Sequence, residues 1–273
     1  MKRHAVPVYF ALVFVISWGG GLLILGPGDF PPSAEQFESL GALLYIAILA
    51  GPCLSGILLI AVVDGRRGLR DLLARLGRWR VGWNAYALAL LPALVMTATA
   101  LLLSLVSADS RPVLIDSNDK GAIVMRALLP AVMVGFFEEI GWTGFAVPHL
   151  RARHSILATG LAVGVVWGAW HLPLFWESDS FSATLPLAIL VTRLFSWLPA
   201  FRVLLVWMYD RTRSLPVVMF MHAAVSFVSL ALQPPEAMTG ARLLIGLLVS
   251  AAMMWLLLAL WYAGSRRASR LTT

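Results

Sequence analysis

Eight long apolar runs constrain the fold of this chain more than any other feature of its sequence. They cover residues 5–25, 41–63, 83–107, 121–147, 155–176, 184–208, 215–233 and 243–263. A helix of about 20 apolar residues is long enough to cross the hydrocarbon core of a bilayer. Only 13% of the residues are charged, whereas soluble domains carry roughly a quarter. The runs therefore predict an all-α, polytopic membrane helix bundle of about eight transmembrane helices, placed in the cell membrane as a multi-pass protein.

The charges at the ends of the runs provide an independent check on the number of spans. Alternate ends and loops (1–4, 64–82, 148–154, 209–214 and 264–273) together hold 15 basic and three acidic residues, whereas the opposite loops hold three basic and nine acidic ones. Because Lys and Arg are retained on the cytoplasmic side of a membrane, this alternation predicts that both termini are cytoplasmic. The basic loops are expected to lie against anionic lipid, which explains the net charge of +7 without nucleic acid.

No linker, low-complexity tract or internal repeat separates the runs, so we expect a single membrane domain over 1–273. The first run is longer than the roughly 7–15 apolar residues of a signal peptide, which predicts an uncleaved first span. Over 64–82, arginines alternate with apolar residues in the manner of an amphipathic helix on the membrane surface. Cys53 is the only cysteine, which excludes a disulfide framework.

Seven ionisable side chains remain inside the predicted spans. An Arg or Asp at the centre of a bilayer costs about 2.5–3.5 kcal/mol on insertion scales, so such residues are functional candidates. The adjacent pair Glu138 and Glu139 is the hardest to explain, because two neighbouring carboxylates cannot both be ionised cheaply in a low dielectric. Such a pair suits a general base or acid, or a metal ligand. The structural alternative is that arginine partners neutralise the pair, with Arg126, Arg193 and Arg202 available. The seven are Arg126, Glu138, Glu139, His171, Arg193, Arg202 and His222.

Two of these side chains are histidines, and each has a polar or aromatic neighbour at helical spacing. Trp167 lies four residues before His171, and Ser226 lies four after His222, so each pair shares a helix face. The tryptophan would exclude water from the site, and the serine could donate a hydrogen bond to a developing oxyanion. Together with the glutamate pair, the histidines could bind Zn²⁺ or polarise a water molecule.

These residues meet only if the helices are tilted or broken. At about 1.5 Å per residue, Glu138 would lie about 15 Å from the cytoplasmic end of its span, His222 about 10 Å and His171 about 24 Å. Gly141 and Gly144 after the carboxylates, and Pro173 after His171, predict locally opened helices that line a cavity.

In its motifs the chain resembles the CPBP family of intramembrane proteases (CAAX protease and bacteriocin-processing, Rce1-like). The family's first motif is a glutamate pair with an arginine four residues after the second glutamate, and here Thr143 stands at that position. The second is an aromatic residue four before a histidine, matched by Trp167 and His171. The third is a histidine with Asn or Asp four later, where this chain has His222 and Ser226. The resemblance places the catalytic core at about 121–233.

The resemblance implies a role for each matching residue. Glu138 would activate the attacking water, as a base or a metal ligand, with His171 positioning it and Glu139 supporting both. His222 would stabilise the tetrahedral oxyanion, aided by Ser226. Zinc or another divalent metal would be bound by Glu138, His171 and His222, although a metal-free water also fits. Because Thr143 replaces the arginine, Glu139 lacks a cationic partner, for which Arg126, Arg151 and Arg193 are candidates.

We therefore expect an intramembrane endopeptidase, similar to CAAX proteases, that hydrolyses a peptide or membrane-protein substrate. Two alternatives stay open on the residues alone. A transporter would also place carboxylates, histidine and arginine at membrane depth, although it predicts internal repeats. A non-catalytic family member, acting as an immunity or scaffold protein, would account for the departures at Thr143 and Ser226.

Overall fold

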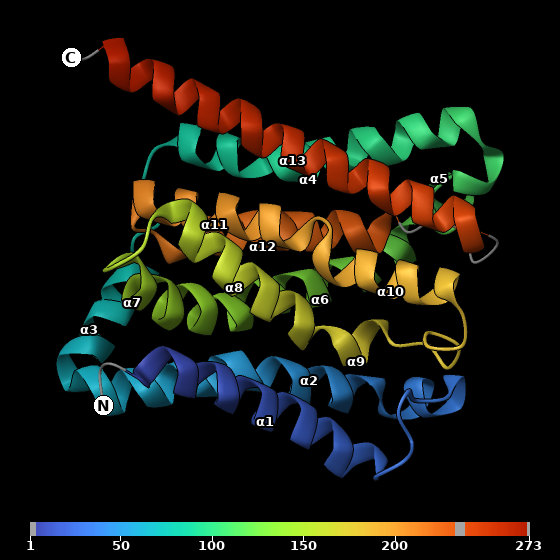
Figure 1. Cartoon of the computed structure of the whole chain (residues 1–273), viewed down its shortest axis with the longest axis horizontal. Coiled ribbons are helices and arrows are strands. Elements are labelled where there is room, and N and C mark those ends of the chain that lie inside the picture. The colour runs from blue at the N-terminus through green and yellow to red at the C-terminus, as the bar shows by residue number, and fades with distance from the viewer. Residues whose placement is uncertain (1–3, 233–237, 272–273) are drawn as a thin grey trace.

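The long helices of this chain lie side by side in one bundle (Figure 1). The computed structural model describes residues 4–232 and 238–271, and all regular elements in those ranges are helical. Six helical segments are long and apolar enough to cross a membrane: Ala5–Leu25, Ala34–Leu76, Trp83–Val106, Lys120–Arg151, Thr184–Thr212 and Gly240–Gly264. Two shorter apolar helices, Ile156–Trp170 and Leu215–Ala231, bring the number to the eight predicted. The predicted polytopic helix bundle is confirmed.

Several of these segments are built from more than one helix. The elements are α1 (Ala5–Leu25), α2 (Ala34–Leu59), η2 (Ile60–Asp64), α3 (Gly65–Leu76), α4 (Trp83–Val106), η3 (Ala108–Ser110), α5 (Val113–Asp116), α6 (Lys120–Gly141), η4 (Trp142–Ala146), α7 (Val147–Arg151), α8 (Ile156–Trp170), α9 (Leu172–Phe175), α10 (Thr184–Phe195), α11 (Leu198–Thr212), α12 (Leu215–Ala231) and α13 (Gly240–Leu271).

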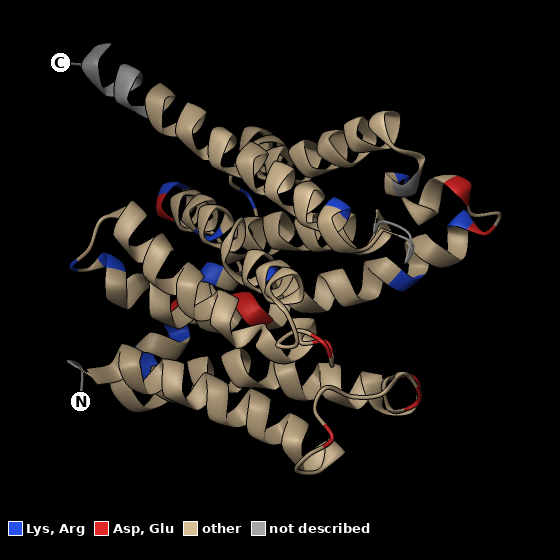
Figure 2. Cartoon of the chain, turned by 45° about the vertical axis from the view of Figure 1, so that its right-hand side comes forward, with Lys and Arg blue, Asp and Glu red and all other residues tan. Residues whose placement is uncertain are grey.

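Charge is divided between the two ends of the bundle as the sequence predicts. Figure 1 places both chain ends at the same end of the bundle. In Figure 2 that end carries much of the blue, and most of the red lies in the loops at the opposite end. Residues 1–3, with their two basic side chains, and the end of the predicted span 215–233 lie outside the described residues.

Helix breaks occur where the sequence places glycine and proline near the ionisable residues. The helix that carries the glutamate pair opens into the π-helical turn η4 before it continues as α7. Helix α8 ends at Trp170, and Pro173 lies in the first turn of α9. The predicted span 184–208 is divided at Ser196 and Trp197, just before Pro199 in the first turn of α11. Proline lacks the N–H that an uninterrupted helix would need, so these breaks follow from local chemistry.

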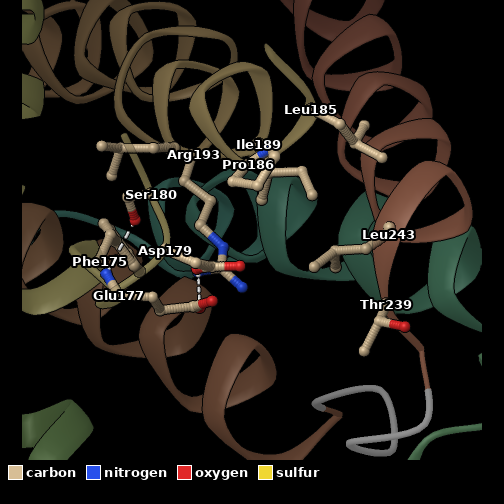
Figure 3. Close-up of a pocket in the computed structure, with 12 residues that line it drawn as sticks. Phe175, Glu177, Asp179, Ser180, Leu185, Pro186, Ile189, Arg193, Thr239 and Leu243 are labelled. Carbon is tan, nitrogen blue, oxygen red and sulfur yellow. Dashed lines mark hydrogen bonds and ion pairs between the residues drawn. The ribbon is translucent and has the colours of Figure 1, made fainter. Parts of the chain in front are cut away.

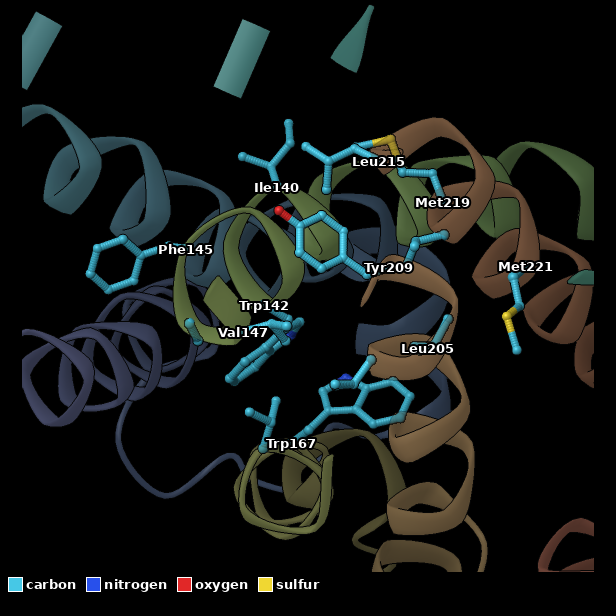
Figure 4. Close-up of a cluster of buried hydrophobic side chains, with 14 of the residues drawn as sticks. Ile140, Trp142, Phe145, Val147, Trp167, Leu205, Tyr209, Leu215, Met219 and Met221 are labelled. Carbon is cyan, nitrogen blue, oxygen red and sulfur yellow. The ribbon is translucent and has the colours of Figure 1, made fainter. Parts of the chain in front are cut away.

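The largest buried side chains gather where η4, α8, α11 and α12 meet. Trp142, Trp167 and Tyr209 are at most 2% exposed, and Figure 4 shows them among aliphatic side chains such as Ile140 and Leu205. The rings of Trp142 and Trp170 meet edge to face, with their centroids 6.0 Å apart. This aromatic cluster surrounds the buried polar residues described below and keeps their surroundings apolar.

Small residues allow α8 to lie directly against α11. A Cβ at Gly160 would lie 2.5 Å from the Cα of Val203, and one at Gly164 would lie 2.6 Å from the Cα of Pro199. Contacts this short involve backbone atoms, which cannot move aside as a side chain can. Close packing through small residues is a main source of helix association in membranes. This contact therefore defines the position of α11 along the axis of α8.

We expect Gly160→Ala to destabilise the protein by about 1–3 kcal/mol, the usual cost of overpacking a close contact. Gly19→Ala is the matched control, because nothing lies within 4 Å of a Cβ at Gly19. Unfolding of both variants in mixed detergent micelles measures the difference. Equal stability of the two variants would contradict the close contact between α8 and α11.

Candidate functional site

Glu139 is fully buried, and side chains from three other elements bind its carboxylate. The Nη1 of Arg202, on α11, donates to Oε1 at 2.8 Å and to Oε2 at 3.0 Å. The Nδ1 of His222, on α12, donates to Oε1 at 2.7 Å, and the hydroxyl of Thr143, in η4, donates to Oε2. The carboxylate therefore joins α6, η4, α11 and α12 in one ion-paired network.

Glu138 has a different environment. Its side chain is 2% exposed, and its Oε2 accepts a hydrogen bond of 2.6 Å from the Nε1 of Trp167 on α8. Among the residues that the structure describes, no other side chain donates to this carboxylate. Neighbouring residues in the sequence thus have distinct surroundings: Glu139 is bound on both oxygens, whereas Glu138 keeps Oε1 available.

Trp167 lies at the centre of the site. The centroid of its ring is 5.0 Å from that of His171 and 5.3 Å from that of His222. The Cζ of Arg202 lies 4.1 Å from the same ring centroid, in a cation–π contact. Trp167 thus contacts three of the four predicted catalytic residues: Glu138, His171 and His222. The fourth, Glu139, is bound directly by Arg202 and His222.

The hydrogen bonds define how both histidine rings are oriented. The Nδ1 of His171 lies 2.8 Å from the backbone oxygen of Trp167. Because a carbonyl only accepts, Nδ1 carries the proton, and in the neutral ring Nε2 is then an acceptor. His222 likewise uses Nδ1 toward Glu139 and keeps Nε2 for another partner. In both rings Nε2 is therefore the nitrogen that these two hydrogen bonds leave unused.

The breaks in the helices remove the difference in depth that straight helices would give. Helix α8 has only 15 residues, and His171 follows at its end. The opened turn η4 lies directly after the glutamate pair, as the two glycines predicted. As a result, Glu138, Glu139, Thr143, Trp167, His171 and His222 lie in one cluster. Ser226 is half-buried, and no described residue forms a hydrogen bond with its side chain.

The arginine that pairs with Glu139 is not one of the three substitutes that we expected. Arg151 pairs with Asp210 at 3.1 Å, Arg193 pairs with Glu177, and Arg126 is exposed. Those three substitutes are corrected to Arg202, which the structural alternative had named as one possible partner of the glutamate pair. The signal was present in the sequence, because Arg202 is one of the seven ionisable side chains within the predicted spans. Only the packing of α11 against α8 shows which arginine reaches the carboxylate.

The predicted metal ligands do not form a cation site as the side chains are placed. In the part of the chain that the structure describes, no three His, Cys, Asp or Glu side chains are grouped so that they could hold a metal ion. His222 Nδ1 and Glu138 Oε2 are engaged by protein partners. Metal binding by Glu138, His171 and His222 therefore stays a prediction.

A cavity of about 180 Å³ lies beside this cluster, between the loop after α9, α10 and the start of α13. Figure 3 shows Arg193 reaching across it to Glu177, with Leu185 and Leu243 on the far wall. One of its lining residues, Phe175, stacks on His171 with ring centroids 5.8 Å apart. The glutamate pair and His222 do not line this cavity, so it adjoins the cluster only through His171.

The buried ion pair predicts a strong dependence of stability on Arg202. We expect Arg202→Leu to lower the free energy of unfolding by about 3–5 kcal/mol, because it leaves the carboxylate of Glu139 buried without a cation. Arg193→Leu is the control, because Arg193 pairs with an exposed carboxylate, and such a pair contributes about 0–1 kcal/mol. Unfolding in mixed micelles compares the two. Similar losses in the free energy of unfolding would mean that the buried ion pair contributes no more to stability than the exposed one.

Comparison with known proteins identifies relatives of this chain. The family model described as Type II CAAX prenyl endopeptidase Rce1-like matches residues 120–228, which contain all three motifs. The chain is also similar to CAAX prenyl protease 2 of Methanococcus maripaludis, at 21% identity over 182 residues. That match covers 66% of this chain and 66% of the relative's own length.

Proposed function

We propose that this multi-pass membrane protein, whose residues 120–228 match the Rce1-like family model, is a CPBP-family endopeptidase that hydrolyses peptide bonds at a site within the membrane. The observation that carries the proposal is the unequal binding of two adjacent carboxylates. Glu139 is bound by Arg202, His222 and Thr143, whereas Trp167 is the one side chain among the described residues that binds Glu138. Arg202 neutralises one carboxylate, so the other can act as a base.

Glu138 takes the role of general base in this proposal. Its free Oε1 accepts a proton from a water molecule, and the oxygen of that water attacks the carbonyl carbon of the scissile bond. Nε2 of His171, held by the bond from its Nδ1 to the backbone of Trp167, orients the water. The same carboxylic acid then returns the proton to the leaving amine when the carbon–nitrogen bond breaks.

His222 takes the role of oxyanion stabiliser. Its Nδ1 donates to Glu139. In the imidazolium form both ring nitrogens carry a proton, so Nε2 can then donate to the carbonyl oxygen as negative charge develops there. A donor that is already oriented costs no reorganisation when the reaction occurs. Glu139 and Arg202 act through His222 as positioning residues. In this scheme Ser226 has no direct part, because no described residue orients its hydroxyl.

The substrate class follows from the setting and from the relative. The site lies among apolar helices and is surrounded by tryptophan and phenylalanine side chains. The relative in Methanococcus maripaludis is named a CAAX prenyl protease. We propose a peptide or membrane-protein substrate that reaches the site from the bilayer. A transport function would need the ionisable residues to line a path, but the carboxylate of Glu139 is bound on both oxygens.

Substitution of the base separates this proposal from a non-catalytic role. We expect Glu138→Gln to lower the rate of peptide-bond cleavage by about 100-fold or more, the usual contribution of a general base. The thermal midpoint should change little, because the amide still accepts from Trp167. His171→Ala should lower the rate by a similar factor. A quenched fluorescent peptide and the purified protein in detergent provide the measurement.

Glu177→Gln is the matched control for charge, because Glu177 is an exposed carboxylate that lines the neighbouring cavity. It should keep the native rate. Undiminished cleavage by Glu138→Gln would refute its role as the base. Absence of cleavage in the native protein, over a panel of peptides, would instead favour the scaffold or immunity function.

The proposed mechanism also predicts the response to chelators. Because no described group of three ligands could hold an ion, we expect cleavage to persist after dialysis against EDTA. Loss of activity that zinc alone restores would show that the ligands regroup around a metal, and the water would then be metal-bound. Metal analysis of the dialysed protein accompanies the assay.

A further inference from the structure

Helix α3 and the residues that follow it present five arginines that have no acidic partner in the part of the chain that the structure describes. Arg66, Arg67 and Arg70 lie on its outer face and are exposed, and Arg78 and Arg80 follow it. The acidic residues nearby are already paired: Asp64 with His149 at 3.3 Å, and Asp71 with Arg75 at 2.9 Å. The five arginines thus form no ion pair with any described residue. We call them the α3 arginine face.

Apolar side chains accompany these arginines. Leu73 is 66% exposed and Trp79 is 57% exposed, and the Cζ of Arg80 lies 4.6 Å from the centroid of the Trp79 ring. Exposed leucine and tryptophan interleaved with arginine are typical of helices that lie in the interface between acyl chains and headgroups. Figure 1 shows α3 at the end of the bundle where both chain ends lie, which is the basic end.

The inner face of α3 is attached to the turn that follows the glutamate pair. Leu72 is buried, and a Cβ at Gly144 would lie 3.1 Å from its Cδ1. The Nη1 of Arg75 donates to the backbone oxygen of Gly144 and to the hydroxyl of Tyr209, both at 3.0 Å. Gly144 belongs to η4, whose Thr143 donates to Glu139. One helix therefore has charged residues on its outer face and reaches the candidate site on its inner face.

Gly65 makes this arrangement possible. It lies at a φ of +63°, which favours glycine, and it redirects the chain between η2 and α3. The chain therefore does not extend α2 straight into the solvent. It returns across the end of the bundle, where Asp64 and His149 join it to α7.

We propose that the α3 arginine face binds the headgroups of anionic phospholipids and that this binding holds η4 in the arrangement that the candidate site requires. The occupant is a membrane surface, because the arginines lie at the basic end of a membrane-crossing bundle and beside exposed apolar side chains. Charge complementarity supplies the attraction, and Leu72 with Arg75 transmits the position of α3 to η4. This concerns regulation of the proposed active site, but its test does not depend on protease activity.

The binding step is tested by titrating the detergent-solubilised protein with dioctanoylphosphatidylglycerol and following the thermal midpoint. A ligand that binds the native state raises that midpoint. Phosphatidylcholine with the same chains, and inorganic phosphate, should have much smaller effects. The double variant Arg66→Gln/Arg70→Gln should weaken binding of the anionic lipid about 30-fold, since each arginine beside an anionic surface contributes roughly fivefold.

The matched control removes two basic residues from the opposite end of the bundle, Arg111→Gln/Lys120→Gln, and should bind the anionic lipid as the native protein does. Equal weakening in both double variants would reduce the effect to net charge and overturn the proposal. So would equal stabilisation by phosphatidylcholine. An equal effect of inorganic phosphate would show an ion site in place of a membrane surface, which also overturns it.

The coupling step is tested by hydrogen exchange of the amides in 139–151 with and without the anionic lipid. Exchange there should slow several-fold in the native protein. The variant Leu72→Ala should still bind the lipid but lose this slowing, because the contact with Gly144 is gone. Slowing that persists in Leu72→Ala, or no slowing in the native protein, would refute the coupling even where the lipid binds. Loss of cleavage activity alone changes neither readout, so failure of the proposed function stays distinguishable.

Discussion

The buried ion pair between Glu139 and Arg202 is the interaction on which the rest of the candidate site depends. Both side chains are fully excluded from solvent, and a charge in that position is tolerated only when its partner is in place. The pair determines how α6 and α11 lie relative to each other. It also determines the surroundings of Glu138, because the guanidinium that binds Glu139 also lies over the ring of Trp167, which donates to Glu138.

The ion pair exists because helices in this chain are broken at particular residues. Proline at the start of α11 and the end of α8 at Trp170 allow two short helices to meet through Gly160 and Gly164. The π-helical turn η4 widens the helix after the glutamates and directs Thr143 back to Glu139. Such openings cost backbone hydrogen bonds, and they are tolerated in membranes where protein surrounds them. They convert a bundle of apolar helices into a polar cluster.

Helix α3, which the sequence predicted only as a helix on the membrane surface, also contacts the turn next to the cluster. The segment 64–82 predicted a surface helix, and α3 has the expected exposed arginines. Its inner face, however, packs on the core through Leu72 and donates to Gly144 through Arg75. Amphipathicity predicts that a helix has two faces, but it does not say which part of the protein the apolar face covers.

The sequence by itself determined the class of the fold, the number of apolar helices and the residues that gather in the site. Those properties follow from local quantities: the length of apolar runs, the cost of a charge in a bilayer, and helical spacing. Only the tertiary structure decided which arginine neutralises Glu139 and which carboxylate is left free, and it placed Ser226 without a hydrogen-bond partner among the described residues. Spacing in the sequence does not show which arginine pairs with Glu139, whether Arg126, Arg151, Arg193 or Arg202. Contact between distant helices depends on their tilt, their breaks and their close packing. Those are properties of several segments at once, so no single stretch of sequence contains them.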